Sequence, residues 1–323
     1  MALSILILLA GLALVIIGAD LLVDGASAIA RKAGLSEFLI GMTIVGIGTS
    51  MPELVVSFTG ALKGSADIAI GNVVGSNIFN VFLILGLTAL VSPVAISPEN
   101  KRRDIPVNII VTLLLILFGM SHTLLGLGES DTISAWMGMV FLVLFVLYML
   151  MSFKTGKTDA TEDSAVGESS SEKKIWLAIL MVLGGLGGLV FGGDIFVDSA
   201  CEIARSAGLS EKFVAITILA CGTSLPELVT CVVAAAKKKG ALALGNIIGS
   251  NVSNILLILG TSALVCPLSF ANIKAVDLGA VALGSIALLT SAWTGRNNRI
   301  GRGDGVSFLL MFAAYMAYLF MTI

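Results

Sequence analysis

Charged residues are scarce in this sequence. They make up 12% of the 323 residues, whereas a soluble globular domain has roughly 25%. Hydrophobic residues make up 57% of the chain. A chain of this composition has too few charges to cover a surface that faces water. We therefore exclude a soluble globular protein and expect a lipid bilayer to surround most of the molecule.

Histidine and cysteine are also few. His122 is the sole histidine, and we expect it to be solvated in a short loop. The cysteines show no CxxC or other metal-ligand spacing, so we interpret them as small apolar packing residues. They are Cys201, Cys221, Cys231 and Cys266. The sequence has no ligand set for zinc or copper, no cofactor motif and no pairing of a nucleophile with a base. We expect no enzyme activity, no cofactor and no nucleic-acid partner.

Long apolar runs recur along the whole chain. Each is long enough to cross a hydrocarbon core of about 30 Å as a helix. We expect an all-α integral membrane protein with ten transmembrane helices. The expected spans are residues 3–30, 36–62, 67–91, 105–123, 133–153, 175–204, 211–236, 241–265, 273–293 and 303–323. The first run lacks the basic start and the cleavage site of a signal peptide, so we expect it to remain in the mature protein.

Basic residues are distributed unevenly among the predicted loops. If the N-terminus is outside the cell, 15 of the 19 Lys and Arg residues lie in cytoplasmic loops. Cytoplasmic loops of membrane proteins carry an excess of Lys and Arg. We therefore expect a multi-pass protein of the cell (inner) membrane with both termini extracytoplasmic. The four basic residues on the other side are Lys63, Arg205, Lys212 and Lys274.

The sequence contains an internal repeat. A shift of 174 residues aligns residues 18–93 with 192–267 without a gap, and about half of the aligned positions are identical. GTSMPELV (48–55) aligns with GTSLPELV (222–229), and GNVVGSNIFN (71–80) aligns with GNIIGSNVSN (245–254). We predict two repeats, residues 1–153 and 175–323, with the duplicated motifs at 39–86 and 213–260. The Ser-rich, partly acidic segment 154–174 would be a cytoplasmic linker.

The number of spans in each repeat determines their relative orientation. Five crossings is an odd number, so the second repeat would begin on the opposite side of the membrane from the first. Inverted repeats with interrupted helices are typical of secondary transporters, which bind their substrate between the two copies. Alternating access explains this symmetry, because two inverted copies of one motif can open and close the two faces of the membrane protein in the same way.

Two acidic residues lie well inside predicted spans. Glu53 and Glu227 occupy equivalent positions in the two repeats, and neither has a basic neighbour in the sequence to neutralise it. A lone carboxylate in the hydrocarbon region is costly and marks function by default. We expect both to face a partner or a watery cavity. A protonated glutamate packed between helices is the alternative.

The sequence weakens the helix around each glutamate. Pro52 and Pro226 remove amide donors and leave carbonyl oxygens free about four residues earlier. Glycines and hydroxyl residues stand beside them, namely Gly46, Gly48, Thr49 and Ser50 in one repeat and Gly222, Thr223 and Ser224 in the other. Carbonyls, hydroxyls and a carboxylate together predict a site made entirely of oxygen ligands.

The next predicted span of each repeat adds hydroxyls and amides. These residues are Ser76, Asn77 and Asn80 in the first repeat and Ser250, Asn251 and Asn254 in the second. Gly71, Gly75, Gly245 and Gly249 in the same spans would mainly allow close helix packing. Oxygen ligands suit hard cations such as Ca²⁺ and Na⁺. Because both ions would need the same two glutamates, we expect occupancy by one to exclude the other.

A second set of acidic residues is repeated near helix ends. Asp20 and Asp24 align with Asp194 and Asp198. We interpret them as residues that reach the membrane interface or pair with Arg31 and Arg205. The alternative is a role in attracting cations to the entrance of the site.

At these motifs the chain resembles the cation/Ca²⁺ antiporter superfamily, and within it the prokaryotic Na⁺/Ca²⁺ exchangers. The resemblance covers GTSxPE and GNxxGSNxxN in both repeats. It implies a central four-helix core with the first and sixth spans sliding across it. It also implies that the ion ligands are Thr49, Ser50, Glu53, Ser76 and Asn80, Thr223, Ser224, Glu227, Ser250 and Asn254, and the backbone carbonyls of Gly46 and Ala220.

The resemblance implies antiport of Na⁺ against Ca²⁺, with no further cofactor and a monomer as the functional unit. Family members often have aspartate at one of the positions of Asn80 and Asn254, and this chain has asparagine at both. That departure leaves a H⁺/Ca²⁺ exchanger or a K⁺-dependent Na⁺/Ca²⁺ exchanger as alternatives. A passive channel is a further alternative, which a duplicated and inverted broken-helix site disfavours.

Overall fold

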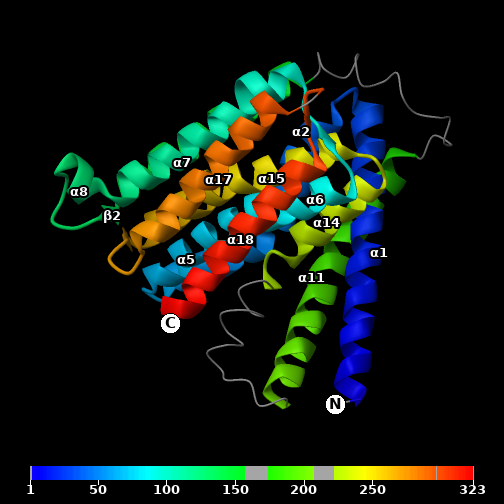
Figure 1. The fold of residues 1–323 in the computed structure, drawn as a ribbon, viewed down its shortest axis with the longest axis horizontal. Coiled ribbons are helices and arrows are strands. Elements are labelled where there is room, and N and C mark those ends of the chain that lie inside the picture. The colour runs from blue at the N-terminus through cyan, green and yellow to red at the C-terminus, as the bar shows by residue number, and fades with distance from the viewer. Residues whose placement is uncertain (1, 157–173, 207–221, 296, 323) are drawn as a thin grey trace.

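The computed structural model describes residues 2–156, 174–206, 222–295 and 297–322. Helices dominate the described chain (Figure 1). The first half contains α1 (Ala2–Ala33), α2 (Glu37–Ile40), η1 (Gly41–Val45), α3 (Gly46–Thr49), α4 (Met51–Leu62), α5 (Ala66–Ile78), η2 (Phe79–Leu85), α6 (Gly86–Val91), β1 (Val94–Ala95), η3 (Asn100–Asp104), α7 (Ile105–Gly119), α8 (Ser121–Leu125), β2 (Thr132–Ile133) and α9 (Ala135–Thr155).

The second half follows a similar order. It contains α11 (Ile175–Ser206), α14 (Leu225–Ala236), α15 (Gly240–Ser253), η5 (Asn254–Leu259), α16 (Gly260–Val265), β3 (Leu268–Ser269), α17 (Ala275–Thr294), β4 (Arg299–Ile300) and α18 (Arg302–Thr322). Elements named η are stretches of π-helix. Both α5 and α15 continue into a π-helix at the end of the GNxxGSN motif.

The apolar helices make this a membrane protein. Seven helices of the described chain are long and apolar enough to cross a bilayer, and the bent pair Glu37–Thr49 and Met51–Leu62 would be an eighth. Two further expected spans correspond to shorter helices. The span 105–123 corresponds to α7, with 15 residues, and the span 211–236 contains α14, with 12. Most of the residues that precede α14 in that span lie outside the described chain.

The predicted helix breaks lie where the prolines are. The two parts of the bent pair meet at an angle of 47°, and Ser50 between them leaves helical geometry with ψ of 8°. Pro52 lies in the first turn of α4, and Pro226 lies in the first turn of α14. Proline fits the first turn because the amides there have no partner within the helix. The break at Ser50 therefore starts a new helix, α4, inside the protein, and α14 likewise begins beside Pro226.

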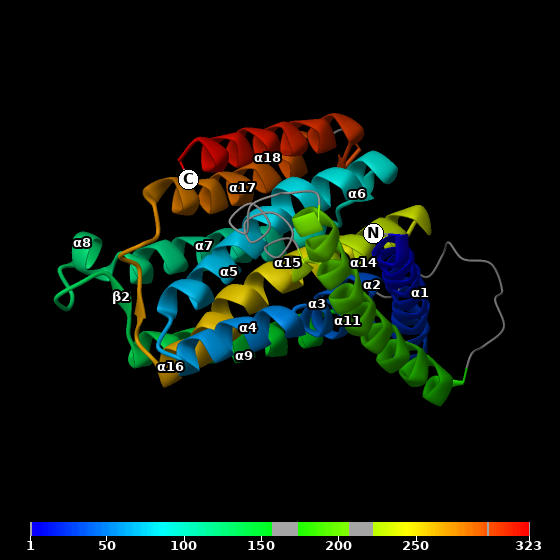
Figure 2. The same ribbon diagram turned by 90° about the horizontal axis from the view of Figure 1, so that it is seen from below.

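A pair of long helices stands beside the rest of the molecule. α1 and α11 pack along their length and project away from the other helices (Figures 1 and 2). They run antiparallel, since Gly11 faces Gly192 and Gly25 faces Ala178. A Cβ atom on Gly18 would come within 2.8 Å of the carbonyl oxygen of Gly185. Glycine is therefore required for the close approach of these two backbones.

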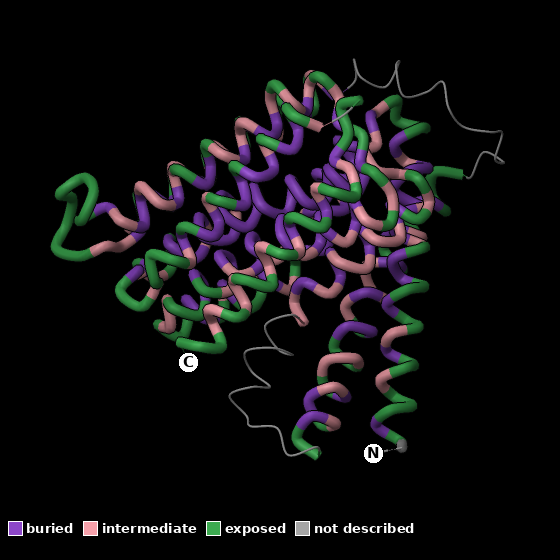
Figure 3. The backbone as a smooth tube through the Cα atoms, viewed as in Figure 1, coloured by how far each residue is buried: buried purple, intermediate pink, exposed green. Residues whose placement is uncertain are grey.

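The centre of the core is α15. In the span Gly240–Val265, 94% of the most apolar stretch is buried, compared with 28% in α1 and in α11. Buried residues concentrate in the middle of the core (Figure 3). A Cβ on Gly245 or Gly249 would overlap the carbonyl oxygens of Phe38 and Met42. The predicted packing role of these two glycines is therefore confirmed. No described atom comes near Gly71 or Gly75, and the residues equivalent to Phe38 and Met42 lie outside the described chain.

Two short ladders tie the halves together at their loops. β1 pairs antiparallel with β4 through Val94 and Ile300. β2 pairs with β3 in the same way through Thr132 and Ser269. Each ladder joins one loop from either half of the chain, so the core helices are held together at both ends.

Candidate cation site

Three carboxylates are buried in the described chain, and two of them have no basic partner. Asp104 forms an ion pair with Arg103 at 3.0 Å and accepts a hydrogen bond from Tyr148. Glu53 and Glu227 are 1% and 2% exposed, and neither forms an ion pair with a described residue. Burial of an unpaired charge is costly. The ion pair with Arg103 therefore offsets the cost of burying Asp104, whereas the two glutamates are buried without an ion pair.

Local structure places each glutamate at a helix start. Glu53 lies in the first turn of α4, and Glu227 lies in the first turn of α14. The amide groups at a helix N-terminus carry partial positive charge and favour a nearby carboxylate. The prolines that begin these helices thus place both acidic groups where the backbone partly offsets their charge.

Serines connect the two motifs crosswise. Ser50 donates a hydrogen bond to Oε1 of Glu227 at 3.1 Å. Ser224 donates to Oε1 of Glu53, also at 3.1 Å. Ser76 lies 3.5 Å from the same oxygen of Glu53 and 3.3 Å from Ser224. The two repeats therefore share one polar cluster in which each motif supports the glutamate of the other.

Asparagines from the neighbouring helices cross in the same manner. Asn80 donates its amide N–H to Oδ1 of Asn251 at 3.0 Å, and Asn254 donates to Oδ1 of Asn77 at 3.1 Å. All four are at most 2% exposed. Because these hydrogen bonds use the amide nitrogens of Asn80 and Asn254, the Oδ1 atoms of the same two side chains point away from Asn251 and Asn77.

Four buried oxygens of this cluster have no hydrogen-bond partner among the described residues. They are Oε2 of Glu53, Oε2 of Glu227, Oδ1 of Asn80 and Oδ1 of Asn254. A buried acceptor without a donor costs about 1–3 kcal/mol. The cluster has one such carboxylate oxygen and one such amide oxygen from each half of the chain.

The threonines of the motif contact two asparagines behind the cluster, Asn246 and Asn72, which we call the second layer. Thr49 Oγ1 lies 3.0 Å from the carbonyl of Val45 and 3.2 Å from Oδ1 of Asn246. Thr223 Oγ1 lies 3.5 Å from Oδ1 of Asn72. Both threonine hydroxyls thus lie within reach of neighbouring acceptors, and each hydroxyl oxygen can also accept or coordinate.

The second layer was not predicted from the sequence. Asn72 donates to the backbone carbonyl of Glu53 at 3.1 Å and to Ser57 at 3.0 Å. Its counterpart Asn246 donates to Sγ of Cys231 at 3.2 Å, so Cys231 does more than the predicted packing. A signal for both asparagines exists in the motif. Each lies four residues before a predicted serine ligand and therefore on the same helix face.

The two predicted backbone-carbonyl ligands, Gly46 and Ala220, differ from the side-chain ligands. The carbonyl of Gly46 already accepts hydrogen bonds from Ser50 N–H and from Ser250, each at 3.2 Å. Ala220 lies outside the described residues. The other predicted ligands all belong to the cluster or to its second layer. The structure thus brings together hydroxyl, amide and carboxylate oxygens from α3, α4, α5 and η2 and from α14, α15 and η5.

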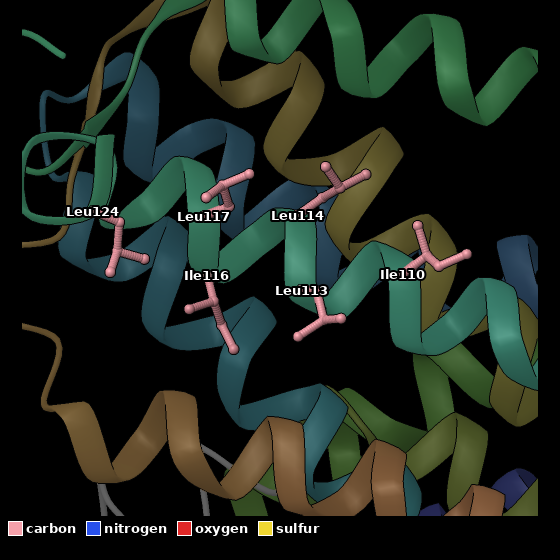
Figure 4. A pocket seen from close by; sticks show the side chains of 6 residues that line it. All are labelled: Ile110, Leu113, Leu114, Ile116, Leu117 and Leu124. Carbon is pink, nitrogen blue, oxygen red and sulfur yellow. The ribbon is translucent and has the colours of Figure 1, made fainter. Parts of the chain in front are cut away.

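The chemistry of the cluster suits a hard cation. In the described chain, no group of three or more His, Cys, Asp and Glu side chains could hold a metal ion. A transition-metal site therefore has no ligand set there, whereas hard cations accept neutral oxygens beside a few carboxylates. A separate recess has only aliphatic lining (Figure 4), from Ile110, Leu113, Leu114, Ile116, Leu117 and Leu124. It offers no ligand to an ion.

Two of the four repeated aspartates, Asp20 and Asp24, have a partner that the sequence did not suggest. Lys237 Nζ lies 2.6 Å from Asp20 and 2.8 Å from Asp24. Arg31 forms no ion pair with any described residue, so the expected pairing of Asp20 and Asp24 with Arg31 was wrong, whereas their expected position at the membrane interface stays a prediction. Burial alone would lower the pKa of Lys237, but hydrogen bonds to Asp20 and Asp24 outweigh it and raise that pKa. Lys237 is therefore charged at neutral pH.

Known proteins resemble the chain over almost its whole length. The family model of sodium/calcium exchanger proteins matches residues 3–154 and 177–321. The putative antiporter CaxA of Alkalimonas amylolytica is 37% identical, with 99% of each chain covered. The sodium/calcium exchanger MaX1 of Methanosarcina acetivorans is 34% identical, with 98% of each chain covered.

The fold is likewise similar to solved structures. A structure of the sodium-calcium exchanger NCX_Mj soaked with Na⁺ and Sr²⁺ superposes with a TM-score of 0.83. The two chains are 31% identical, and the match covers 98% of each. Sequence and fold thus point to the same group of proteins. The chain therefore belongs to the sodium/calcium exchanger protein family.

Proposed function

We propose that this protein is a secondary active antiporter that exchanges Na⁺ for Ca²⁺ across the membrane by alternating access. The observation that carries the proposal is the pair of buried glutamates, Glu53 and Glu227, each with one oxygen that lacks a hydrogen-bond donor. They lie where two copies of one motif meet and hydrogen-bond across each other. Such a cluster binds cations and has no arrangement for chemical catalysis.

Ca²⁺ would bind among oxygens from both halves. It takes 6–8 oxygen ligands, and the four unsatisfied oxygens would be the first of them. About two to four hydroxyl oxygens, from among Thr49, Ser50, Thr223 and Ser224 and from Ser76 and Ser250, would complete the shell. We keep Gly46 and Ala220 as carbonyl ligands that the family resemblance implies. Gly46 would then have to accept an ion beside its present hydrogen bonds.

Exchange would follow from competition for these ligands. Two ionised glutamates carry about two negative charges, which one Ca²⁺ or two Na⁺ would neutralise. Both ions need Glu53 and Glu227, so a bound Na⁺ would displace Ca²⁺ and the reverse. A protein that can cross between its two facing states only with a neutralised site would then couple the two fluxes.

The symmetry of the chain supports alternating access. We propose ten spans in two inverted repeats, residues 1–153 and 175–323, joined by the linker 154–174 and carrying the motifs at 39–86 and 213–260. The antiparallel course of α1 and α11, the first helices of the two repeats, supports the inversion. The distribution of Lys and Arg supports a cell-membrane protein with both termini outside. One chain contributes both motifs, so a monomer would suffice.

The names of the relatives agree with this assignment. MaX1 is named a sodium/calcium exchanger, and NCX_Mj was soaked with Na⁺ and Sr²⁺. Sr²⁺ is a larger divalent cation of the same hard, oxygen-binding type as Ca²⁺. We propose Na⁺ and Ca²⁺ as the substrates of this chain on the same grounds.

Proteoliposomes would test the proposal. Vesicles loaded with Na⁺ and diluted into Na⁺-free medium should take up radioactive Ca²⁺, and dissipating the Na⁺ gradient should abolish the uptake. The control is the same protein with Glu53→Gln. Uptake that follows a pH gradient without Na⁺ would assign a H⁺/Ca²⁺ exchanger, and uptake that needs K⁺ together with Na⁺ would assign the K⁺-dependent class. Uptake faster than transporter rates without any gradient would indicate a channel.

A further inference from the structure

An ion-paired contact fastens α1 to the core at one end of the molecule. Lys237, which caps the C-terminus of α14, binds Asp20 at 2.6 Å and Asp24 at 2.8 Å. Lys239 lies 3.5 Å from the same oxygen of Asp24. The aspartates come from the first half of the chain and the lysines from the second. These ion pairs are thus a link between one of the two projecting helices and the loop between α14 and α15.

The chain contains the same residues at the opposite end. With the 174-residue shift of the repeat, Asp20 aligns with Asp194, Asp24 with Asp198, and Lys237 with Lys63. Lys63 caps the C-terminus of α4 as Lys237 caps that of α14. Among the described residues, Lys63 forms no ion pair with Asp194 or Asp198, and all three side chains are exposed. The second set of charges is therefore present but apart.

Packing of the helices shows the same difference. α1 packs along α14, whereas the equivalent contact of α11 with α4 is nearly absent. α1 and α11 are meanwhile joined closely through their glycines, so that a Cβ on Gly192 would come within 2.8 Å of the Val15 amide. Two helices joined in this way would move as one unit. A movement that separates α1 from α14 would then carry α11 toward α4.

We propose that Asp20, Asp24 and Lys237 form one of two alternating latches, and that Asp194, Asp198 and Lys63 form the other. In the state seen here the first latch is closed and the second is open. In the opposite facing state Lys237 releases α1, and Lys63 binds Asp194 and Asp198 of α11. This inference rests on the proposed transport function, because it assigns a role in alternating access to charges that lie outside the ion site.

The exposure of the first latch fits a contact that must break in every cycle. The side chain of Lys237 is 27% exposed, and those of Asp20 and Asp24 are 54% and 33% exposed. Ion pairs at this depth contribute little to stability, because water competes for them. Two latches of matched chemistry would hold either end state without making one of them too stable to leave.

Cross-linking between the halves would test both contacts. The native cysteines are first replaced, Cys231 by Ser and the other three by Ala, and a protease site is placed in the linker 154–174. Asp24→Cys with Lys237→Cys forms one pair, and Asp198→Cys with Lys63→Cys forms the other. A short bis-methanethiosulfonate reagent bridges the two cysteines over the span that the Lys and Asp side chains occupied, which is longer than a direct disulfide. After cleavage, the halves stay together on a non-reducing gel only where the reagent has joined both cysteines. Each pair is assayed in Na⁺, in Ca²⁺ and without either ion.

We expect each pair to cross-link, with opposite dependence on the ion condition. Each cross-link should block Ca²⁺ uptake, and a reductant should restore it. Failure of the Asp198 and Lys63 pair to cross-link in every ion condition would overturn the proposal. Uptake that continues with the Asp24 and Lys237 pair cross-linked would also overturn it. Failure of the proposed function would show differently, as absent Na⁺-driven uptake in the unmodified protein with cross-linking unaffected.

Charge removal gives a second test with a matched control. Lys237→Gln weakens the latch at the face where α14 ends, which favours the state open to that face. The apparent affinity for Ca²⁺ applied there should rise by about two- to fivefold. Lys63→Gln should lower it by a similar factor. Lys238→Gln, in the same loop but without an ion pair to any described residue, should change it by less than either. Shifts of the same sign for Lys237→Gln and Lys63→Gln would contradict the two-latch proposal.

Discussion

The two halves of the molecule are alike at the candidate site and unlike at their ends. At the centre, Glu53 and Glu227 receive equivalent hydrogen bonds from Ser224 and Ser50 at the same distance of 3.1 Å. At the ends, Lys237 binds two aspartates and its counterpart Lys63 binds none of the described residues. An exchanger needs this combination. The site must present the same ligands to either side, while the two ends of the protein must never be open at the same time.

The largest effect should come from the two glutamates. Glu53→Gln and Glu227→Gln should each reduce Ca²⁺ transport by more than about a hundredfold, since breaking a buried charged interaction costs about 3–5 kcal/mol. Ca²⁺ flux into proteoliposomes measures this, and thermal unfolding checks that the variants fold. Glu129→Gln, in an exposed loop, is the matched control. If one of the two buried variants kept near-normal flux, the halves would not be equivalent at the centre.

A second effect should appear in the glycine contact between α1 and α11. Gly18 and Gly192 are equivalent in the two repeats, and a Cβ atom added to either would come within 3 Å of the backbone of the other helix. Gly18→Val and Gly192→Val should each lower the free energy of unfolding by about 1–3 kcal/mol through overpacking. The measurement is the thermal midpoint in detergent.

The control for the glycine variants lies on the same helix. Gly184 is exposed, and no described atom lies within 4 Å of a Cβ placed there. Gly184→Val should therefore leave the midpoint nearly unchanged. Equal destabilisation by Gly184→Val and Gly192→Val would show that the close helix contact is not the cause.

The second-layer asparagines should show a smaller and unequal effect. Each variant removes three hydrogen bonds, which Asn246 makes with Thr49, Ser250 and Cys231. Those of Asn72 include the backbone carbonyl of Glu53, the charged residue of its half, besides Ser57 and Thr223. If the ion site loses the equivalent of one hydrogen bond, about 1 kcal/mol, Asn246→Ala should weaken Ca²⁺ affinity by about fivefold and Asn72→Ala by more. Ca²⁺ binding by the purified variants checks this order. A larger effect of Asn246→Ala would reverse the inferred difference between the halves.

The smallest effect is expected where the two halves differ in chemistry. Ser57 aligns with Cys231, and each accepts a hydrogen bond from the second-layer asparagine of its own half. Cys231→Ser should change the Ca²⁺ affinity by about twofold or less, because a hydroxyl accepts the same hydrogen bond. Ser57→Cys is the reciprocal variant. A tenfold change in either would mean that this difference between the halves is functional.

Residues in the duplicated motifs could be found from the sequence, because a polar side chain in an apolar span is costly unless it binds a partner or an ion. Glu53, Glu227 and their neighbouring hydroxyls satisfy that rule, and the fold brings them into one cluster. The helix breaks at Pro52 and Pro226 were likewise predictable, since proline cannot continue an i to i−4 ladder. Such features depend on local chemistry and on the repeat alone.

Contacts between distant elements could not be found in this way. The pairing of Asp20 with Lys237 joins residues 217 positions apart, and sequence proximity favoured Arg31 instead. The roles of Asn72 and Asn246 depend on which neighbours their amides reach, and a motif does not specify those. The carbonyl of Gly46 is a further case, because Ser250 from another helix already donates to it. In each case, the packing of the helices determines which residues come into contact.

Equilibrium binding of radioactive Ca²⁺ to the purified protein at several Na⁺ concentrations tests the shared site most directly. We predict saturable Ca²⁺ binding whose capacity is constant while the apparent dissociation constant rises with Na⁺, because both ions use Glu53 and Glu227. The same titration with Glu227→Gln should lose high-affinity binding. A Ca²⁺ affinity that is independent of Na⁺, or a capacity that falls while the affinity stays constant, would contradict the account.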